Sequence, residues 1–230
     1  MTNINRDFRL TSDKYFQDIV AKTQVYIHHT VGGSALSTFR YWQSQSNRVA
    51  TAYIIERDGT IYEVFDPHFW AWHLGLKTNT NSVANKQSIG IELGSEGALR
   101  SGKELNDKLG SKKFDENYLY AFDIDVAPFT NAKKLYHISE KDKYWQGSFR
   151  GYNYFDAYDD AQLDSLYSLV CDLCNQFNIP KKLIPNVDKN VFDPSLITGF
   201  SGVLTHCNVR QDKTDVHPGF NWKRLEWALK

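Results

Sequence analysis

The chain has 230 residues, of which 41% are hydrophobic, and this length and composition suit one generous folded domain. Lys plus Arg and Asp plus Glu both number 27, so the net charge at pH 7 is zero. Because no long block of like charge occurs, the sequence argues against a nucleic-acid binder, whose affinity depends on a basic face.

The sequence also argues against a membrane partner, since no apolar stretch is long enough to span a bilayer. The first residues contain no apolar run typical of a signal peptide, so we expect synthesis in the cytoplasm. Cys171, Cys174 and Cys207 form no obvious disulfide framework and suit a reducing compartment. We expect the C-x-x-C pair, Cys171 and Cys174, to pack in the core of a monomer.

The first part of the chain predicts three short strands and one helix after a polar arm over residues 1–22. Asp58-Gly59 lies between two β-rich runs and is a strong hairpin signal. The expected elements are strands at residues 24–30, 52–56 and 61–65 and a helix from Ser34 to about Gln43.

Residues 88–94 predict a further strand because they alternate in period two. One face carries Ile89, Ile91 and Leu93, and the other carries Ser88, Gly90 and Glu92. A buried unpaired carboxylate is costly. Glu92 is therefore either a functional group or an edge residue that faces water.

Residues 95–152 fit no simple period and alternate Lys-rich with aromatic pieces. The segment is too long for an idle loop, so we expect hairpins within it. It could be a substrate-binding flap, or a decoration that covers a sheet edge.

The clearest helix of the chain runs from Asp159 or Asp160 to about Asn178, where Pro180 stops it. A linker over residues 181–199 then leads to a short strand at residues 202–205. Residues 222–229 predict a terminal helix.

The loop that follows residues 202–205 places His206, Lys213 and Asp215 close together in the sequence. Imidazole and carboxylate both bind zinc, and a catalytic zinc typically takes three protein ligands, so a third ligand would come from elsewhere. A lysine nearby could stabilise a developing oxyanion. Any loop of this length can also carry such residues by chance, so the motif needs its structural context.

The order of the predicted elements is an α/β plan in which polar residues lie at or beyond strand ends, where open sheets usually build their sites. Five blocks that occur in order resemble the type 2 N-acetylmuramoyl-L-alanine amidase family, which includes phage endolysins, muropeptide-recycling amidases and peptidoglycan recognition proteins. The resemblance covers about residues 24–94 and 156–225. The blocks are Ile27-His-His-Thr, Tyr53-Ile-Ile-Glu-Arg-Asp-Gly-Thr-Ile-Tyr, Ala71-Trp-His-Leu-Gly, Ser88-Ile-Gly-Ile-Glu-Leu, and His206 to Asp215-x-x-Pro-Gly.

The resemblance implies one zinc amidase domain over residues 1–230, with a central mixed β-sheet flanked by helices and an aromatic-rich insertion at about residues 95–152. It implies one catalytic zinc ion and a peptidoglycan or muropeptide substrate. The residues that it implies are His28, His206 and Asp215 as zinc ligands, Glu92 and Lys213 as catalytic groups, and Thr30, Trp72 and His73 as substrate-binding groups.

The chain departs from the family pattern near the implied ligands. Three other side chains compete for the metal, namely His29, Cys207 and His217. Thr51 stands where some phage amidases carry a catalytic tyrosine, and Ala52 replaces a common histidine. In the absence of that tyrosine, Glu92 must do more of the proton transfer.

The leading hypothesis is a zinc-dependent N-acetylmuramoyl-L-alanine amidase that acts as a phage-type endolysin on the cell wall. A cytosolic muropeptide-recycling amidase and a non-catalytic peptidoglycan-binding module are the alternatives. Loss of a zinc ligand usually marks the binding modules, and no implied ligand is lost here.

Overall fold

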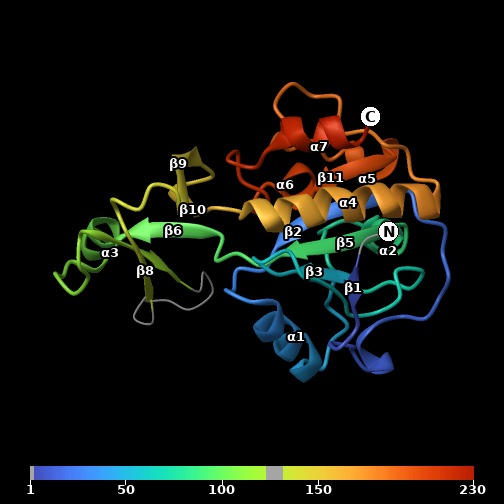
Figure 1. Ribbon diagram of the computed structural model, residues 1–230, viewed down its shortest axis with the longest axis horizontal. Coiled ribbons are helices and arrows are strands. Elements are labelled where there is room, and N and C mark those ends of the chain that lie inside the picture. The colour runs from blue at the N-terminus through green and yellow to red at the C-terminus, as the bar shows by residue number, and fades with distance from the viewer. Residues whose placement is uncertain (1–2, 123–131) are drawn as a thin grey trace.

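The computed structural model describes residues 3–122 and 132–230. They contain two β-sheets with helices around them (Figure 1). The first sheet has the strand order β1-β4-β3-β5-β2-β11. Its central strands are parallel, whereas β4 is antiparallel to β3. Its strands are β1 (Ile4–Asn5), β2 (Gln24–His29), β3 (Tyr53–Ile55), β4 (Ile61–Glu63), β5 (Ser88–Leu93) and β11 (Gly202–Thr205). The predicted central mixed sheet and the β3–β4 hairpin are confirmed.

Helix α4 (Asp160–Phe177) lies across one face of the first sheet (Figure 1). It begins after Asp159 and ends at Asn178, which has a left-handed conformation with φ of 55°. Its apolar stripe, which recurs at helical spacing, is buried against the sheet. The members of the stripe are Leu163, Leu166, Tyr167, Leu169, Val170, Leu173 and Cys174. The predicted long helix and the core position of Cys174 are confirmed.

The other helices that lie around the first sheet are short. Ser34 caps α1 as predicted, because its side chain accepts a hydrogen bond from the amide of Ser37. The helices are α1 (Ala35–Ser44), α2 (Asn81–Lys86), α5 (Leu196–Gly199), α6 (His206–Val209) and α7 (Trp222–Ala228), with a 3-10 turn at Ser12–Lys14.

The two faces of the first sheet differ because side chains alternate along each strand. On the α4 face, Val25, Ile27 and Val203 join the main core. On the opposite face, Tyr26 and Leu204 pack in a smaller core with Leu74 and Leu76. Side chains at the carboxyl ends of β2, β5 and β11 can therefore meet on the face away from α4.

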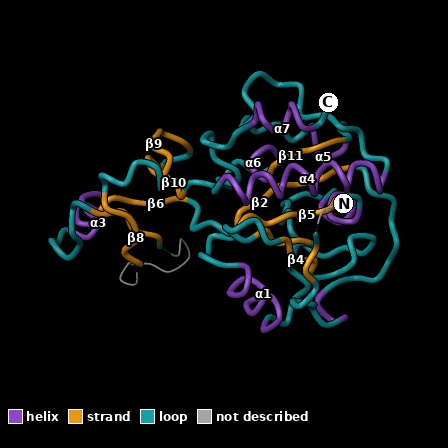
Figure 2. Tube along the Cα trace, viewed as in Figure 1, coloured by secondary structure: helices purple, strands orange, loops and turns teal. Residues whose placement is uncertain are grey.

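Residues 96–122 and 132–156 form the second sheet and one helix, and we call this part of the chain the lobe. Figure 2 shows the lobe at one end of the long axis, beside the first sheet. Its strands are antiparallel in the order β8-β7-β6-β10-β9. The elements are β6 (Ala98–Ser101), α3 (Gly102–Leu109), β7 (Tyr118–Ala121), β8 (Lys133–His137), β9 (Tyr144–Phe149) and β10 (Tyr152–Asp156).

The predicted hairpins in the segment 95–152 are confirmed, since β9 and β10 form one. The sequence did not predict that they join into a sheet of their own. A part of this segment, residues 123–131, lies outside the described residues.

Two segments that we predicted to be irregular contain short elements. In the polar arm over residues 1–22, β1 pairs with β4 at the sheet edge and Leu10 is buried. In the linker over residues 181–199, α5 forms one turn. Elements this short show no hydrophobic period. Within residues 3–122 and 132–230, no helix combines the length and the apolar character needed to cross a membrane.

The packing of α4 can be tested at Leu166, which is fully buried in the main core. We expect Leu166→Ala to lower the free energy of unfolding by about 2–5 kcal/mol, because it leaves a cavity between helix and sheet. Urea denaturation measures this change. Ser168→Ala is the control, because Ser168 lies two residues further along the same helix and is exposed. This variant should change the free energy of unfolding by less than about 0.5 kcal/mol. Equal stability of the two variants would contradict the packing.

Candidate metal centre

Three buried side chains from separate parts of the chain meet on the face of the first sheet that α4 does not cover. They are His28 on β2, His206 at the start of α6 and Asp215 in the loop after α6. Strands β2 and β11 are parallel neighbours, so the ends that carry His28 and His206 lie side by side. The chain brings together the three residues that the sequence implied as ligands.

The three candidate ligand atoms form a nearly equilateral triangle. The Nδ1 atoms of His28 and His206 are 3.1 Å apart, and Oδ2 of Asp215 lies 3.1 Å from the first and 3.0 Å from the second. All three residues are at most 5% exposed. A metal bound at about 2.0–2.2 Å from nitrogen and oxygen ligands can contact all three atoms of such a triangle at once.

Hydrogen bonds on the far side of each ring fix where its proton lies. Nε2 of His206 is 2.8 Å from the carbonyl oxygen of Leu74, to which it can only donate. Oγ of Ser88 donates to the carbonyl of Ala84, so it accepts from Nε2 of His73 at 2.9 Å. Nδ1 of His73 then accepts from Nε2 of His28 at 3.0 Å.

These bonds leave the Nδ1 atoms of His28 and His206 facing Asp215. Burial lowers the pKa of His28 to about 4 and that of His73 well below its usual range, so His28 and His73 are neutral at pH 7. A single proton could bridge only one edge of the triangle, whereas a metal ion satisfies all three atoms. The donor set therefore fits a divalent cation, with His73 and Ser88 as partners that orient the ring of His28.

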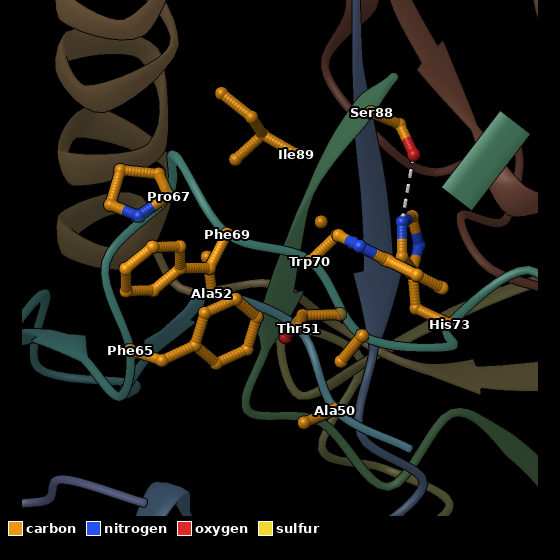
Figure 3. A pocket seen from close by; sticks show the side chains of 12 residues that line it. Ala50, Thr51, Ala52, Phe65, Pro67, Phe69, Trp70, His73, Ser88 and Ile89 are labelled. Carbon is orange, nitrogen blue, oxygen red and sulfur yellow. Dashed lines mark hydrogen bonds between the residues drawn. The ribbon is translucent and has the colours of Figure 1, made fainter. Parts of the chain in front are cut away.

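Gly90 makes room for this hydrogen-bond chain. A Cβ atom at residue 90 would lie 2.6 Å from Cγ2 of Thr51 and 3.2 Å from Nδ1 of His73. Figure 3 shows the bond between His73 and Ser88 beside a buried cavity of about 10 Å³. That volume holds one water at most, so the cavity is no substrate site.

Glu92 is the neighbour of His28 across the β2–β5 pairing. Its Oε2 atom is buried, and no described residue hydrogen-bonds to it. Burial and the nearby Asp215 raise the pKa of Glu92 well above its usual range, while Lys213 lowers it. Lys213 is half-buried in the same loop as Asp215. An acid–base group and a cation thus lie close to the three candidate ligands.

The competing residues lie outside the triangle. His29 points to the α4 face, where its Nδ1 is 2.9 Å from the hydroxyl of Tyr158. The thiol of Cys207 contacts Thr205, Asn190 and Val216 instead, and burial raises its pKa to about 11.

His217 is also buried away from the triangle, with Nε2 at 3.1 Å from the carbonyl of Asp156. Thr51, at the position of the missing tyrosine, is buried and donates to the carbonyl of Tyr53.

The residues predicted to bind substrate occupy three different environments. The hydroxyl of Thr30 hydrogen-bonds to the carbonyl of Gly32 in the loop after β2. Trp72 is partly buried and packs edge-on against Trp70. His73 contacts His28 directly, so its described contacts belong to the metal centre.

The sequence analysis missed the roles of Ser88 and Gly90. The available signal was the alternation of β5, which puts both residues on the same face as Glu92. Both residues are small, but only the folded chain shows that His73 occupies the space above them.

Comparisons with known proteins bear on the family and the fold of the chain. Residues 20–219 match the family described as N-acetylmuramoyl-L-alanine amidase. No match is found among curated proteins.

Several solved structures share the fold, each with less than 25% sequence identity. One is AmiD from E. coli in complex with the substrate anhydro-N-acetylmuramic acid-L-Ala-D-gamma-Glu-L-Lys, with a TM-score of 0.52, 18% identity, and coverage of 92% of this chain and 59% of that chain. PlyL has a TM-score of 0.54 and 14% identity, over 99% of this chain and 97% of that chain. The PlyG catalytic domain has a TM-score of 0.50 and 13% identity, over 99% of this chain and 93% of that chain. The present chain thus spans a little over half the length of AmiD and nearly all of the other two.

The triangle can be tested by exchanging the two adjacent histidines. We expect His28→Ala to lose bound metal, because one of three ligand atoms is removed, and His29→Ala to keep it. Elemental analysis of purified protein after incubation with zinc and desalting gives the metal content. Retention of stoichiometric zinc by His28→Ala, with loss by His29→Ala, would show that the wrong histidine has been assigned.

Proposed function

Since the chain belongs to the N-acetylmuramoyl-L-alanine amidase family, we propose that it is a zinc-dependent enzyme that hydrolyses the lactyl-L-alanine amide of peptidoglycan as a phage-type endolysin. The observation that carries the proposal is the triangle of His28, His206 and Asp215, whose ligand atoms lie within 3.1 Å of one another. Hydrogen bonding directs both imidazole lone pairs into it. Zinc at this position would lower the pKa of a water towards about 7 and polarise a carbonyl oxygen.

Glu92 is the proposed proton carrier. Amide hydrolysis requires removal of a proton from the attacking water and delivery of a proton to the departing nitrogen. The buried Oε2 atom of Glu92, next to His28 in the sheet, has no protein partner among the described residues and can make both transfers. Its raised pKa makes the Glu92 carboxylate a better base towards the attacking water.

Lys213 is the proposed oxyanion partner. Its positive charge acts on both Glu92 and His28, and this supports a role for the ammonium group near the reacting centre. A cation there stabilises the negative charge that develops on the carbonyl oxygen as the tetrahedral intermediate forms.

The proposed substrate is polymeric peptidoglycan. The crystallised ligand of AmiD is an anhydro-muropeptide, which carries the same type of bond. The lobe adds a second, aromatic-rich sheet beside the first sheet, and partly exposed aromatic rings suit stacking on sugars. A larger surface of this kind favours a wall polymer over a small soluble fragment. We propose that the enzyme is made inside the cell and acts on the wall.

The role of Glu92 predicts a separation of metal binding from turnover. We expect Glu92→Gln to bind zinc as the wild type does, because Glu92 is no ligand, and to lose about 100-fold to 10,000-fold in kcat. Zinc titration and amide hydrolysis are measured on the same preparations. Full turnover by this variant would rule out the assigned role.

The bond that is cleaved can be identified by digestion of purified peptidoglycan. We expect new L-alanine amino termini and no new reducing sugar ends, and we expect activity to disappear on chelation and return with zinc. Intact sacculi should be cleaved faster than soluble anhydro-muropeptides. The reverse preference would favour a recycling amidase, and no cleavage of either with zinc bound would favour a binding module.

A further inference from the structure

The loop that carries Lys213 and Asp215 is held in place by few bonds of its own. We call residues 206–217 the ligand loop. It begins with the single turn of α6 and then lacks regular structure. Within it, the amide of Cys207 donates to the carbonyl of Asp215 at 2.7 Å and the amide of Arg210 to the carbonyl of His206 at 3.0 Å. A one-turn helix leaves carbonyl groups near its end that need partners from outside.

Arg150 of the lobe is a partner for one of those carbonyls and for two carbonyls further along the loop, one of which also accepts a hydrogen bond from the amide of Lys213 at 3.3 Å. Its Nη2 atom donates to the carbonyl of Cys207 at 2.8 Å, and its Nη1 atom donates to the carbonyls of Arg210, at 2.6 Å, and of Lys213. The planar guanidinium carries five N–H donors in a fixed fork, so it can join three carbonyls at once. One side chain of the lobe thus ties together the stretch that leads to Asp215.

Trp145 of the same hairpin contacts the chain on the other side of Asp215. Its ring stacks on His217 with 5.7 Å between ring centroids. It also covers Gly219, where an added Cβ atom would lie 2.6 Å from Cγ of the ring. The β9–β10 hairpin therefore holds the chain both before and after the candidate ligand.

The backbone at Arg150 is unusual for an arginine. Arg150 and Gly151 form the two-residue turn between β9 and β10, with φ of 48° and 83°. Asn-Gly is the favoured sequence for such a turn, whereas arginine has no conformational advantage there. The side chain at this position is therefore better explained by the three carbonyls that it reaches than by the turn.

We propose that Arg150 is a positioning residue for the metal centre and that the lobe acts on the reaction through it. The proposal rests on the zinc amidase function proposed above. By holding the carbonyls of Cys207, Arg210 and Lys213, the guanidinium fixes the path of the ligand loop. That path sets where the carboxylate of Asp215 meets the two histidines.

Arg150→Asn tests this role, because it creates the favoured Asn-Gly turn and removes the guanidinium together with its contact to the ring of Phe149. We expect backbone amides of residues 206–217 to exchange with deuterium about 10-fold faster or more in the metal-free variant, while α4 exchanges as in the wild type. We also expect the zinc dissociation constant, measured by competition with a chelator, to rise about 10-fold to 100-fold. Arg150→Lys keeps the positive charge but lacks the planar set of N–H donors. Its exchange rate and its zinc dissociation constant should lie between those of the wild type and of Arg150→Asn.

Lys141→Ala is the control, since Lys141 is exposed on the same lobe and bonds only within it. It should leave both quantities unchanged. Unchanged exchange of residues 206–217 together with unchanged zinc affinity in Arg150→Asn would overturn the proposal. If Arg150→Asn also loosens α4, Arg150→Lys decides by the same two measurements. Exchange is measured without metal or substrate, so a wild-type protein that fails to cleave peptidoglycan would refute the proposed function and leave this test intact.

Discussion

The metal centre depends on three lone pairs that the fold forces into one small volume. Two of them belong to rings whose outer nitrogens must donate, one to the carbonyl of Leu74 and one to His73. Without a shared cation a proton could bridge only one edge of the triangle formed by His28, His206 and Asp215, and the remaining buried atom would be poorly satisfied. A divalent ion can bind all three atoms. The small residues of β5 and the bond from His73 to Ser88 serve that same arrangement.

Much of this site follows from strand alternation and chain order. Period two on residues 88–94 separates Glu92 from the isoleucines, and the parallel pairing of β2 with β11 and β5 brings three strand ends together. Alternation also predicts that only one of His28 and His29 faces the metal. It cannot say which one, since that choice depends on which face α4 covers. The family resemblance supplied the choice, and the structure places His28 in the triangle.

The sequence could not predict the features that depend on tertiary contacts, because such contacts leave no periodic pattern of hydrophobic residues in the sequence. The lobe has short strands, so the lysines and aromatics of residues 95–152 indicate hairpins but not how they join. The proton positions around His73 depend on a carbonyl at Ala84 that no motif marks. Arg150 has no sequence signal at all, because its three acceptors are backbone atoms about 60 residues away.

Arg150 can hold the ligand loop in place only if the lobe is itself fixed to the first sheet. Asp156 provides that attachment. Its carboxylate is fully buried at the end of β10, where the chain leaves the lobe. It accepts hydrogen bonds from the amide of Glu96, at 2.6 Å, and the hydroxyl of Ser95, at 3.2 Å, where the chain enters the lobe. Arg57, in the β3–β4 turn, pairs with it, and Tyr136 of β8 donates to its other oxygen at 2.8 Å. A buried charge with this many donors is stable only while all of them stay in place. These bonds fix the lobe to the first sheet. The guanidinium of Arg150, in the β9–β10 hairpin, can therefore hold the ligand loop in one position.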